Sequence, residues 1–210
     1  MSAKVRRALS LFCSIAVFLM VAMCVLSNFV DMPLSKANMD VTGSMCFRYF
    51  TYDSNILAAI ASLFLLLSEL CRKRVSRAAL LWKYAGTCAV AVTLVTVLCF
   101  LGPRMGYPFL LSGTGFYLHA LVPVLSIFSF LLWDGGGSLR GSDLICGILP
   151  VGLYAGVYLS LVVLWPTWPD FYGFNLGGKW YVSLVAMIAA AVGIAALLRA
   201  LRNRITVSKR

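Results

Sequence analysis

The pattern of hydrophobic and polar positions divides the chain into six long apolar segments separated by polar connections. The six segments run approximately from Ala8 to Leu26, Tyr49 to Leu70, Leu80 to Leu101, Phe116 to Trp133, Leu144 to Trp165 and Trp180 to Leu198. Each has about the 20 residues with which an α-helix crosses a bilayer of roughly 30 Å. The pattern therefore predicts an all-α fold, in which residues 1–210 form a single domain of six transmembrane helices.

The composition supports the bilayer as the main solvent of this chain. Hydrophobic residues make up 61% of the sequence and charged residues only 12%, whereas soluble domains carry about 25% charged residues. The first apolar segment is longer than the hydrophobic part of a signal peptide and has no small-residue cleavage motif, so we expect it to be retained. We expect a multi-pass integral membrane protein.

The basic residues decide the predicted orientation. A net charge of +11 could indicate nucleic acid as a partner, but the eighteen lysines and arginines are divided unevenly between the connections on the two sides of the membrane. Fourteen lie on the side of the membrane that holds the N-terminus, and four (Lys36, Arg48, Arg104 and Lys179) lie on the other side. Because basic connections stay in the cytoplasm, we expect both termini there. The excess charge then contacts lipid headgroups, and nucleic acid is not an expected partner.

The cysteine and histidine pattern argues against a metal or haem site. Seven cysteines are scattered without a C-x-x-C pair, and His119 is the only histidine. We expect no cofactor. Gly152 and Gly156 form a G-x-x-x-G pair in the fifth segment, which predicts close packing against another helix.

A polar stripe runs along the second segment. At about 100° per residue, Thr51, Asn55, Ser62 and Glu69 fall on one narrow face, while the opposite face is Leu, Ile and Phe. Polar groups are costly in hydrocarbon, so we expect the stripe to face the bundle interior.

Thr51 and His119 begin the second and fourth segments, which cross the membrane in the same direction. Their helical positions place them within roughly 5 Å of the same depth. A hydroxyl becomes a nucleophile when a neighbouring base takes its proton, and histidine suits that task. Simpler interpretations remain open: Thr51 could cap the helix, His119 could bond a carbonyl or line a polar cavity, and Asn55 could join helices.

Two short motifs carry a resemblance to a known family. Arg48-Tyr49-Phe50-Thr51 before a membrane helix, and Tyr117-Leu118-His119 followed by Pro123, resemble the androgen-induced family of integral membrane hydrolases. That family includes the androgen-dependent regulator of tissue factor pathway inhibitor. The resemblance implies cleavage of fatty acid esters of hydroxy fatty acids by a threonine and a histidine, here Thr51 and His119.

The same resemblance implies a location and a substrate entrance. Ser54 and Asn55 are more similar to the bacterial relatives, so a bacterial plasma membrane is expected. The aromatic and proline-rich segment 165–172 matches the family in composition but not in exact sequence, and it is expected to shape the substrate entrance.

The leading hypothesis is a carboxylic ester hydrolase that takes lipid esters from the outer leaflet. Thr51 would be the nucleophile, His119 the base, and Asn55 a candidate to orient Thr51 or to stabilise the oxyanion. The alternatives are a six-helix solute-binding subunit, such as the capturing component of a vitamin importer, and a structural partner protein.

Overall fold

A computed structural model describes residues 2–32, 42–72 and 75–207, and all the regular structure in these ranges is helical. It confirms the all-α prediction and contains six helices long and apolar enough to cross a membrane. The single-segment spans are α1 (Ala3–Leu26), α2 (Phe50–Arg72) and α9 (Trp180–Val207). The other three spans combine α-helix with π-helical or 3-10 turns. The third span consists of α3 (Arg77–Thr96), η2 (Val97–Leu101) and α4 (Gly102–Met105), and the fourth of α6 (Thr114–Phe116), η3 (Tyr117–Leu121), α7 (Val122–Phe128) and η4 (Ser129–Trp133). The fifth span consists of η5 (Gly141–Asp143), α8 (Leu144–Leu159) and η6 (Ser160–Leu164). The connections hold η1 (Gly43–Arg48), α5 (Tyr107–Leu110) and η7 (Leu176–Gly178).

Most of the helices extend beyond the predicted apolar segments, because capping residues and not hydropathy set their ends. The hydroxyl of Ser2 accepts a hydrogen bond from the Val5 amide, and α1 therefore begins at Ala3 and not Ala8. Ser76 does the same for the Ala79 amide at the start of α3. The charged last turns remain helical, so α9 continues past Leu198 to Val207.

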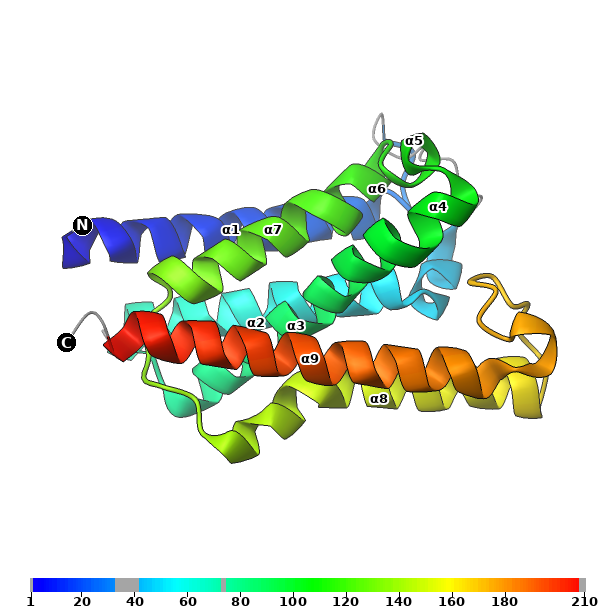
Figure 1. Cartoon of the computed structure of the whole chain (residues 1–210). Coiled ribbons are helices and arrows are strands. Elements are labelled where there is room, and N and C mark those ends of the chain that lie inside the picture. Colours follow the sequence, from blue (N-terminus) through cyan, green and yellow to red (C-terminus); the bar gives the residue numbers. More distant parts are fainter. Residues whose placement is uncertain (1, 33–41, 73–74, 208–210) are drawn as a thin grey trace.

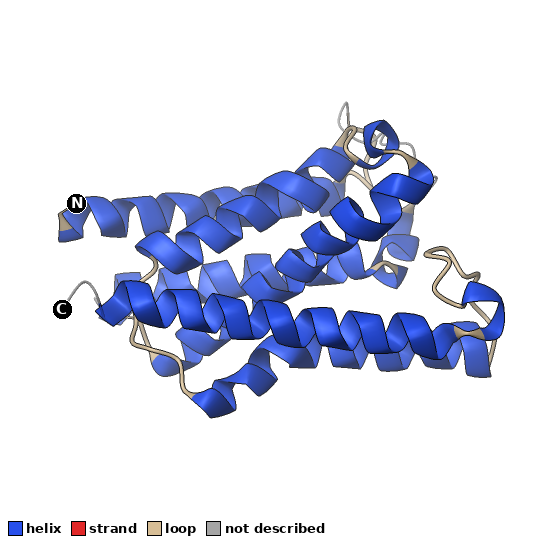
Figure 2. Ribbon diagram, viewed as in Figure 1, coloured by secondary structure: helices blue, strands red, loops and turns tan. Residues whose placement is uncertain are grey.

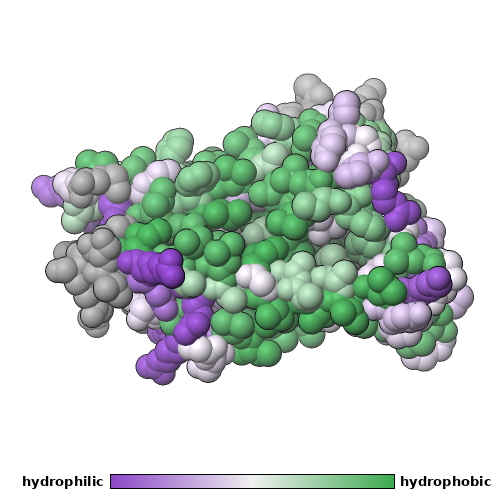
Figure 3. Space-filling model, viewed as in Figure 1, coloured by the Kyte–Doolittle hydropathy of each residue, from purple (hydrophilic) through white to green (hydrophobic). Residues whose placement is uncertain are grey.

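The helices form one bundle with α3 at its centre. In Figure 1, α1 and α7 lie on one side of α2 and α3, while α8 and α9 cover the other side, and the pairs α2–α3, α1–α2, α3–α8 and α8–α9 pack against each other. Both termini lie at one end, which we call the terminal end; the opposite end, where α1 finishes and α9 begins, is the distal end (Figures 1 and 2). On the face shown in Figure 3, hydrophobic residues fill the middle and hydrophilic residues gather towards the two ends, as a bilayer requires.

Close helix packing occurs at two glycines, but not at the predicted pair. A Cβ at Gly86 would lie 2.9 Å from the Ala58 Cα, and one at Gly147 would lie 2.9 Å from the Ala195 Cβ. By contrast, a Cβ at Gly152 or Gly156 would meet no described atom within 4 Å, because this face of α8 points away from the bundle. The predicted role of the G-x-x-x-G pair within the bundle is therefore wrong.

The same substitution, glycine to alanine, should therefore affect stability differently at Gly86 and at Gly156. Gly86→Ala should lower the melting temperature in detergent, since the new methyl group meets the backbone of α2. Gly156→Ala should raise it or leave it unchanged, because alanine favours a helix by roughly 0.5–1 kcal/mol over glycine. Equal effects of the two substitutions would contradict the packing described here.

A buried charged cluster lies near the terminal end. Lys83 is one of the fourteen basic residues assigned to the side of the N-terminus, yet it is inside α3 and only 1% exposed. Its ammonium group donates to the Ser62 hydroxyl at 2.7 Å and lies 3.9 Å from the carboxylate of Asp134. The hydroxyl of Ser10 also donates to Asp134, at 2.8 Å. The buried Asp134 carboxylate thus joins α1 and α3 to the end of the fourth span.

Arg202 and Glu69 extend this cluster. The Arg202 guanidinium is 2% exposed and donates to the Gly135 carbonyl at 2.6 Å. Glu69 is 5% exposed, and its backbone carbonyl accepts from Arg7 at 2.8 Å. Lys83 and Arg202 were counted among the residues that contact headgroups, but they are used inside the protein to hold helices together.

Candidate active site

The polar stripe of α2 faces the bundle interior, as predicted. Thr51, Asn55, Ser62 and Glu69 are all at most 9% exposed. Thr51 is the second residue of α2, so it is not the residue that caps this helix. The Thr51 hydroxyl is therefore available for contacts other than a helix cap.

Thr51 and His119 meet at the distal end of the bundle. Their side chains come from α2 and η3, and the Thr51 Oγ1 lies 3.3 Å from the His119 Nε2. Both residues are buried, with exposed fractions of 9% and 7%. The sequence-based estimate of a common depth is confirmed.

A backbone carbonyl fixes which nitrogen of His119 faces the threonine. The His119 Nδ1 lies 2.7 Å from the carbonyl oxygen of Leu110, at the end of α5. A carbonyl can only accept, so Nδ1 carries the proton in the neutral ring. Nε2 then presents its lone pair to Thr51, whose hydroxyl donates to it. This is the arrangement of a nucleophile beside a general base.

Local sequence explains how His119 reaches this position. Pro123 has no amide hydrogen, so it cannot make the α-helical bond to the His119 carbonyl four residues earlier. The helix instead forms the π-helical turn η3, in which the Val122 amide donates to the Tyr117 carbonyl. Gly115 then allows the Leu110 carbonyl to approach, since a Cβ there would lie 2.4 Å from that oxygen. Together, proline and glycine aim the imidazole at Thr51.

Asn55 positions the pair and does not offer a free donor. Its Nδ2 donates to the Thr51 carbonyl at 2.6 Å and to the Leu118 carbonyl at 3.0 Å. Two carbonyl acceptors also fix the orientation of the amide, because Oδ1 could not bond either one. Asn55 therefore ties the backbone of the nucleophile to the residue before the base, and the structure does not support its candidacy as an oxyanion donor.

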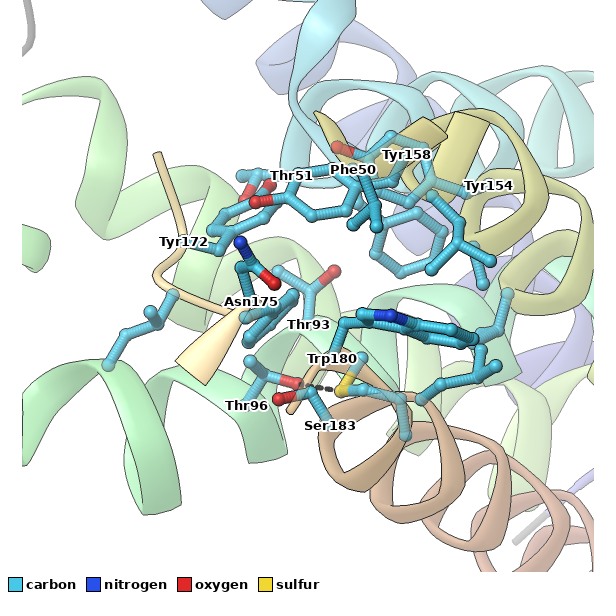
Figure 4. A pocket seen from close by; sticks show the side chains of 18 of the residues that line it. Phe50, Thr51, Thr93, Thr96, Tyr154, Tyr158, Tyr172, Asn175, Trp180 and Ser183 are labelled. Carbon is cyan, nitrogen blue, oxygen red and sulfur yellow. Dashed lines mark hydrogen bonds between the residues drawn. The ribbon is translucent and has the colours of Figure 1, made fainter. Parts of the chain in front are cut away.

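Thr51 lies on the wall of an apolar cavity at the distal end (Figure 4). About 70 Å³ of the cavity is open to water-sized molecules, and the cavity continues into an open mouth. Its lining comes from α2, α3, η2, α8, η6, α9 and the connection 165–179, and includes Phe50, Val97, Tyr154, Leu159, Trp180 and Met187. Among the described residues, no group of three or more His, Cys, Asp or Glu side chains gathers where a metal ion could bind.

Neither a family model nor a curated protein nor a solved structure matches this chain significantly. The site must therefore be judged from its own geometry.

The sequence did not identify Tyr172, which lies against Thr51 in the same cavity. It belongs to the aromatic segment that was expected only to shape the substrate entrance. Asp170 holds this segment in place: its carboxylate accepts from the Phe174 amide at 2.9 Å and the Asn175 amide at 3.0 Å, and also from the Tyr158 hydroxyl. Aspartate is common in turns because its carboxylate can accept from nearby backbone amides, but only the fold shows which side chain this turn places beside Thr51.

Proposed function

We propose that this protein is an integral membrane hydrolase that cleaves lipid esters with Thr51 as nucleophile and His119 as base. One observation carries the proposal: a threonine hydroxyl bonded to the lone-pair nitrogen of the only histidine, at the wall of a mainly apolar, open cavity.

The proposed reaction has two halves that use the same pair. His119 Nε2 takes the proton of the Thr51 hydroxyl while Oγ1 bonds to the ester carbonyl carbon. The bond to the alcohol oxygen then breaks, and this oxygen leaves with the proton from Nε2. Water attacks the acyl-threonine, gives a proton to Nε2, and the fatty acid leaves as Thr51 recovers its hydrogen.

The proposed substrates are fatty acid esters, including those of hydroxy fatty acids. The walls of the cavity at Val97, Leu159 and Met187 suit a hydrocarbon chain, while Thr51 lies where the ester carbonyl would sit. Such esters reside in the bilayer, which surrounds the bundle, so lipids are the expected partners and the membrane supplies the substrate. A bacterial plasma membrane remains the expected location.

A solute-binding subunit is the second candidate, because the cavity is not wholly apolar. Thr96, Ser183 and Asn175 also line it, and the buried Oδ1 of Asn175 has no hydrogen-bond partner. A small polar solute could satisfy this oxygen. In that case the purified protein should retain a ligand through detergent extraction, detectable by mass spectrometry, and should not turn over esters.

The direct test uses the purified wild-type protein. It should release acid from a branched fatty acid ester and from simple nitrophenyl esters, and a fluorophosphonate should add its mass to the peptide that contains Thr51. If the protein neither hydrolyses any ester nor takes the probe, the solute-binding candidate replaces the hydrolase.

We further propose that both termini are cytoplasmic, which places Thr51 near the outer leaflet. The basis is the excess of basic residues at the terminal end. Cys46, in the connection between the first two spans, would be a native reporter of the outer side, but it is fully buried. The exposed positions 167 and 138 at opposite ends are better reporters.

In a Cys71→Ser background, which removes an exposed thiol, Thr167→Cys should react with a membrane-impermeant maleimide on intact cells. Ser138→Cys should react only after permeabilisation. The reverse pattern would invert the proposed orientation.

A further inference from the structure

The proposed hydrolysis requires one more chemical group, and the assignment of that group rests on the proposed function. When Thr51 attacks, negative charge develops on the former carbonyl oxygen. Donors aimed at that oxygen are usually among the largest contributions to catalysis. Asn55 cannot serve, since both of its amide hydrogens are used by backbone carbonyls. Another donor must face the cavity beside Thr51.

Tyr172 presents an unused hydroxyl at this place. The side chain is 9% exposed, lines the cavity, and has its hydroxyl oxygen buried without a hydrogen-bond partner. The phenol nevertheless lies close to the hydroxyls of Thr51 and Tyr154 and to the backbone at the start of α2, although no contact there has normal hydrogen-bond geometry. Figure 4 shows Tyr172 beside Thr51 at one end of the cavity.

An unpaired buried hydroxyl is unusual and reduces stability, so its presence needs an explanation. The surrounding structure holds the ring firmly. Tyr49 and Tyr158 pack against it with ring centroids 6.1 Å and 5.7 Å away, and the Asp170 turn fixes the backbone. The protein thus holds the hydroxyl in place without an acceptor in normal hydrogen-bond geometry.

We propose that Tyr172 is a catalytic residue whose hydroxyl donates a hydrogen bond to the oxyanion of the lipid ester during attack by Thr51. The electron pair of the carbonyl double bond moves to the oxygen as the Oγ1–carbon bond forms, and the Tyr172 proton stays on the phenol throughout. When the double bond re-forms, the alcohol oxygen leaves with the proton held by His119. The same donor serves again when water attacks the acyl-threonine.

Two features favour this assignment. Burial raises the pKa of Tyr172, so the phenol keeps its proton at neutral pH and remains a donor. The neighbouring Tyr154 cannot substitute for it, because the Tyr154 hydroxyl already donates to the Arg48 carbonyl at 2.6 Å. The amino end of α2 lies beside the same point and adds its positive dipole to the site.

The test compares Tyr172→Phe with Tyr84→Phe. Tyr172→Phe should lower kcat by about 10²–10³-fold with little change in KM, and it should leave the melting temperature equal or higher because it removes an unpaired hydroxyl. Tyr84 is fully buried far from the cavity lining, and its hydroxyl donates to the Ala195 carbonyl at 2.7 Å. Tyr84→Phe should show the opposite result, with a lower melting temperature and unchanged kcat.

Each outcome has a definite meaning. If the wild type hydrolyses esters and Tyr172→Phe retains its kcat, the oxyanion assignment is overturned while the hydrolase proposal stands. A fall in melting temperature to match that of Tyr84→Phe would make the hydroxyl structural, and also overturns the assignment. If the wild type itself hydrolyses no ester, both proposals fail together.

Discussion

Thr51→Ala and His119→Ala are each expected to reduce ester hydrolysis by on the order of 10⁴-fold or more, and to leave a folded, detergent-stable protein. The first removes the atom that forms the covalent bond, and the second removes the base 3.3 Å from it. Because nucleophile and base act as one unit, the double variant should be scarcely slower than either single variant. Acid release and melting temperature should be measured on the same preparations.

The cost in stability should be small by comparison. Thr51→Ala removes one hydrogen bond between side chains, and His119→Ala removes that bond and the bond to the Leu110 carbonyl; each bond contributes about 1 kcal/mol. Thr87→Ala provides a matched control, since Thr87 is a buried threonine of α3 that does not line the cavity. It should keep full turnover. If Thr51→Ala keeps turnover as Thr87→Ala does, Thr51 is not the nucleophile.

Lys83→Ala is expected to have the largest effect on stability, about 3–5 kcal/mol in free energy of unfolding. The substitution leaves the buried Asp134 carboxylate without the ammonium group 3.9 Å away, and it removes the donor to Ser62. Lys4→Ala, at an exposed position of α1, should change stability by at most about 0.5 kcal/mol. Thermal unfolding in detergent measures both.

A double variant tests whether the loss comes from an unpaired charge. Adding Asp134→Asn to Lys83→Ala should cost less than the sum of the two single effects, because the neutral amide no longer needs a cation. Strict additivity would mean that the two residues do not interact, and the cluster would then not be an ion-paired core.

The sequence predicts the helices and the inward-facing polar stripe of α2 well, because both follow from the low polarity of the bilayer interior. A run of about 20 apolar residues has one stable arrangement in a bilayer, and a polar face on α2 has one favourable direction. Thr51 and His119 could be brought together from depth alone, since both begin helices that run the same way. These inferences need only helix geometry.

The rest depends on contacts between segments that are distant in the chain. Lys83 resembles part of a basic connection until Asp134 supplies a buried partner. Gly156 resembles a packing residue, but the crossing of α8 turns it outward. Tyr172 shows no sign of its role in the sequence, since an entrance loop and a loop that delivers a hydroxyl to Thr51 have the same composition.

The buried Lys83 also sets an order for assembly during synthesis. Lys83 is synthesised before Asp134, and its ammonium group cannot remain alone in hydrocarbon. Lys83 lies close to the start of α3, so its long side chain can extend to the headgroups while it waits. We therefore expect α3 to insert at a shallow position and to move inward only once the fourth span delivers its carboxylate. Final closure of the bundle would then follow translation of Asp134, and a chain truncated before this residue should be recognised by quality-control proteases.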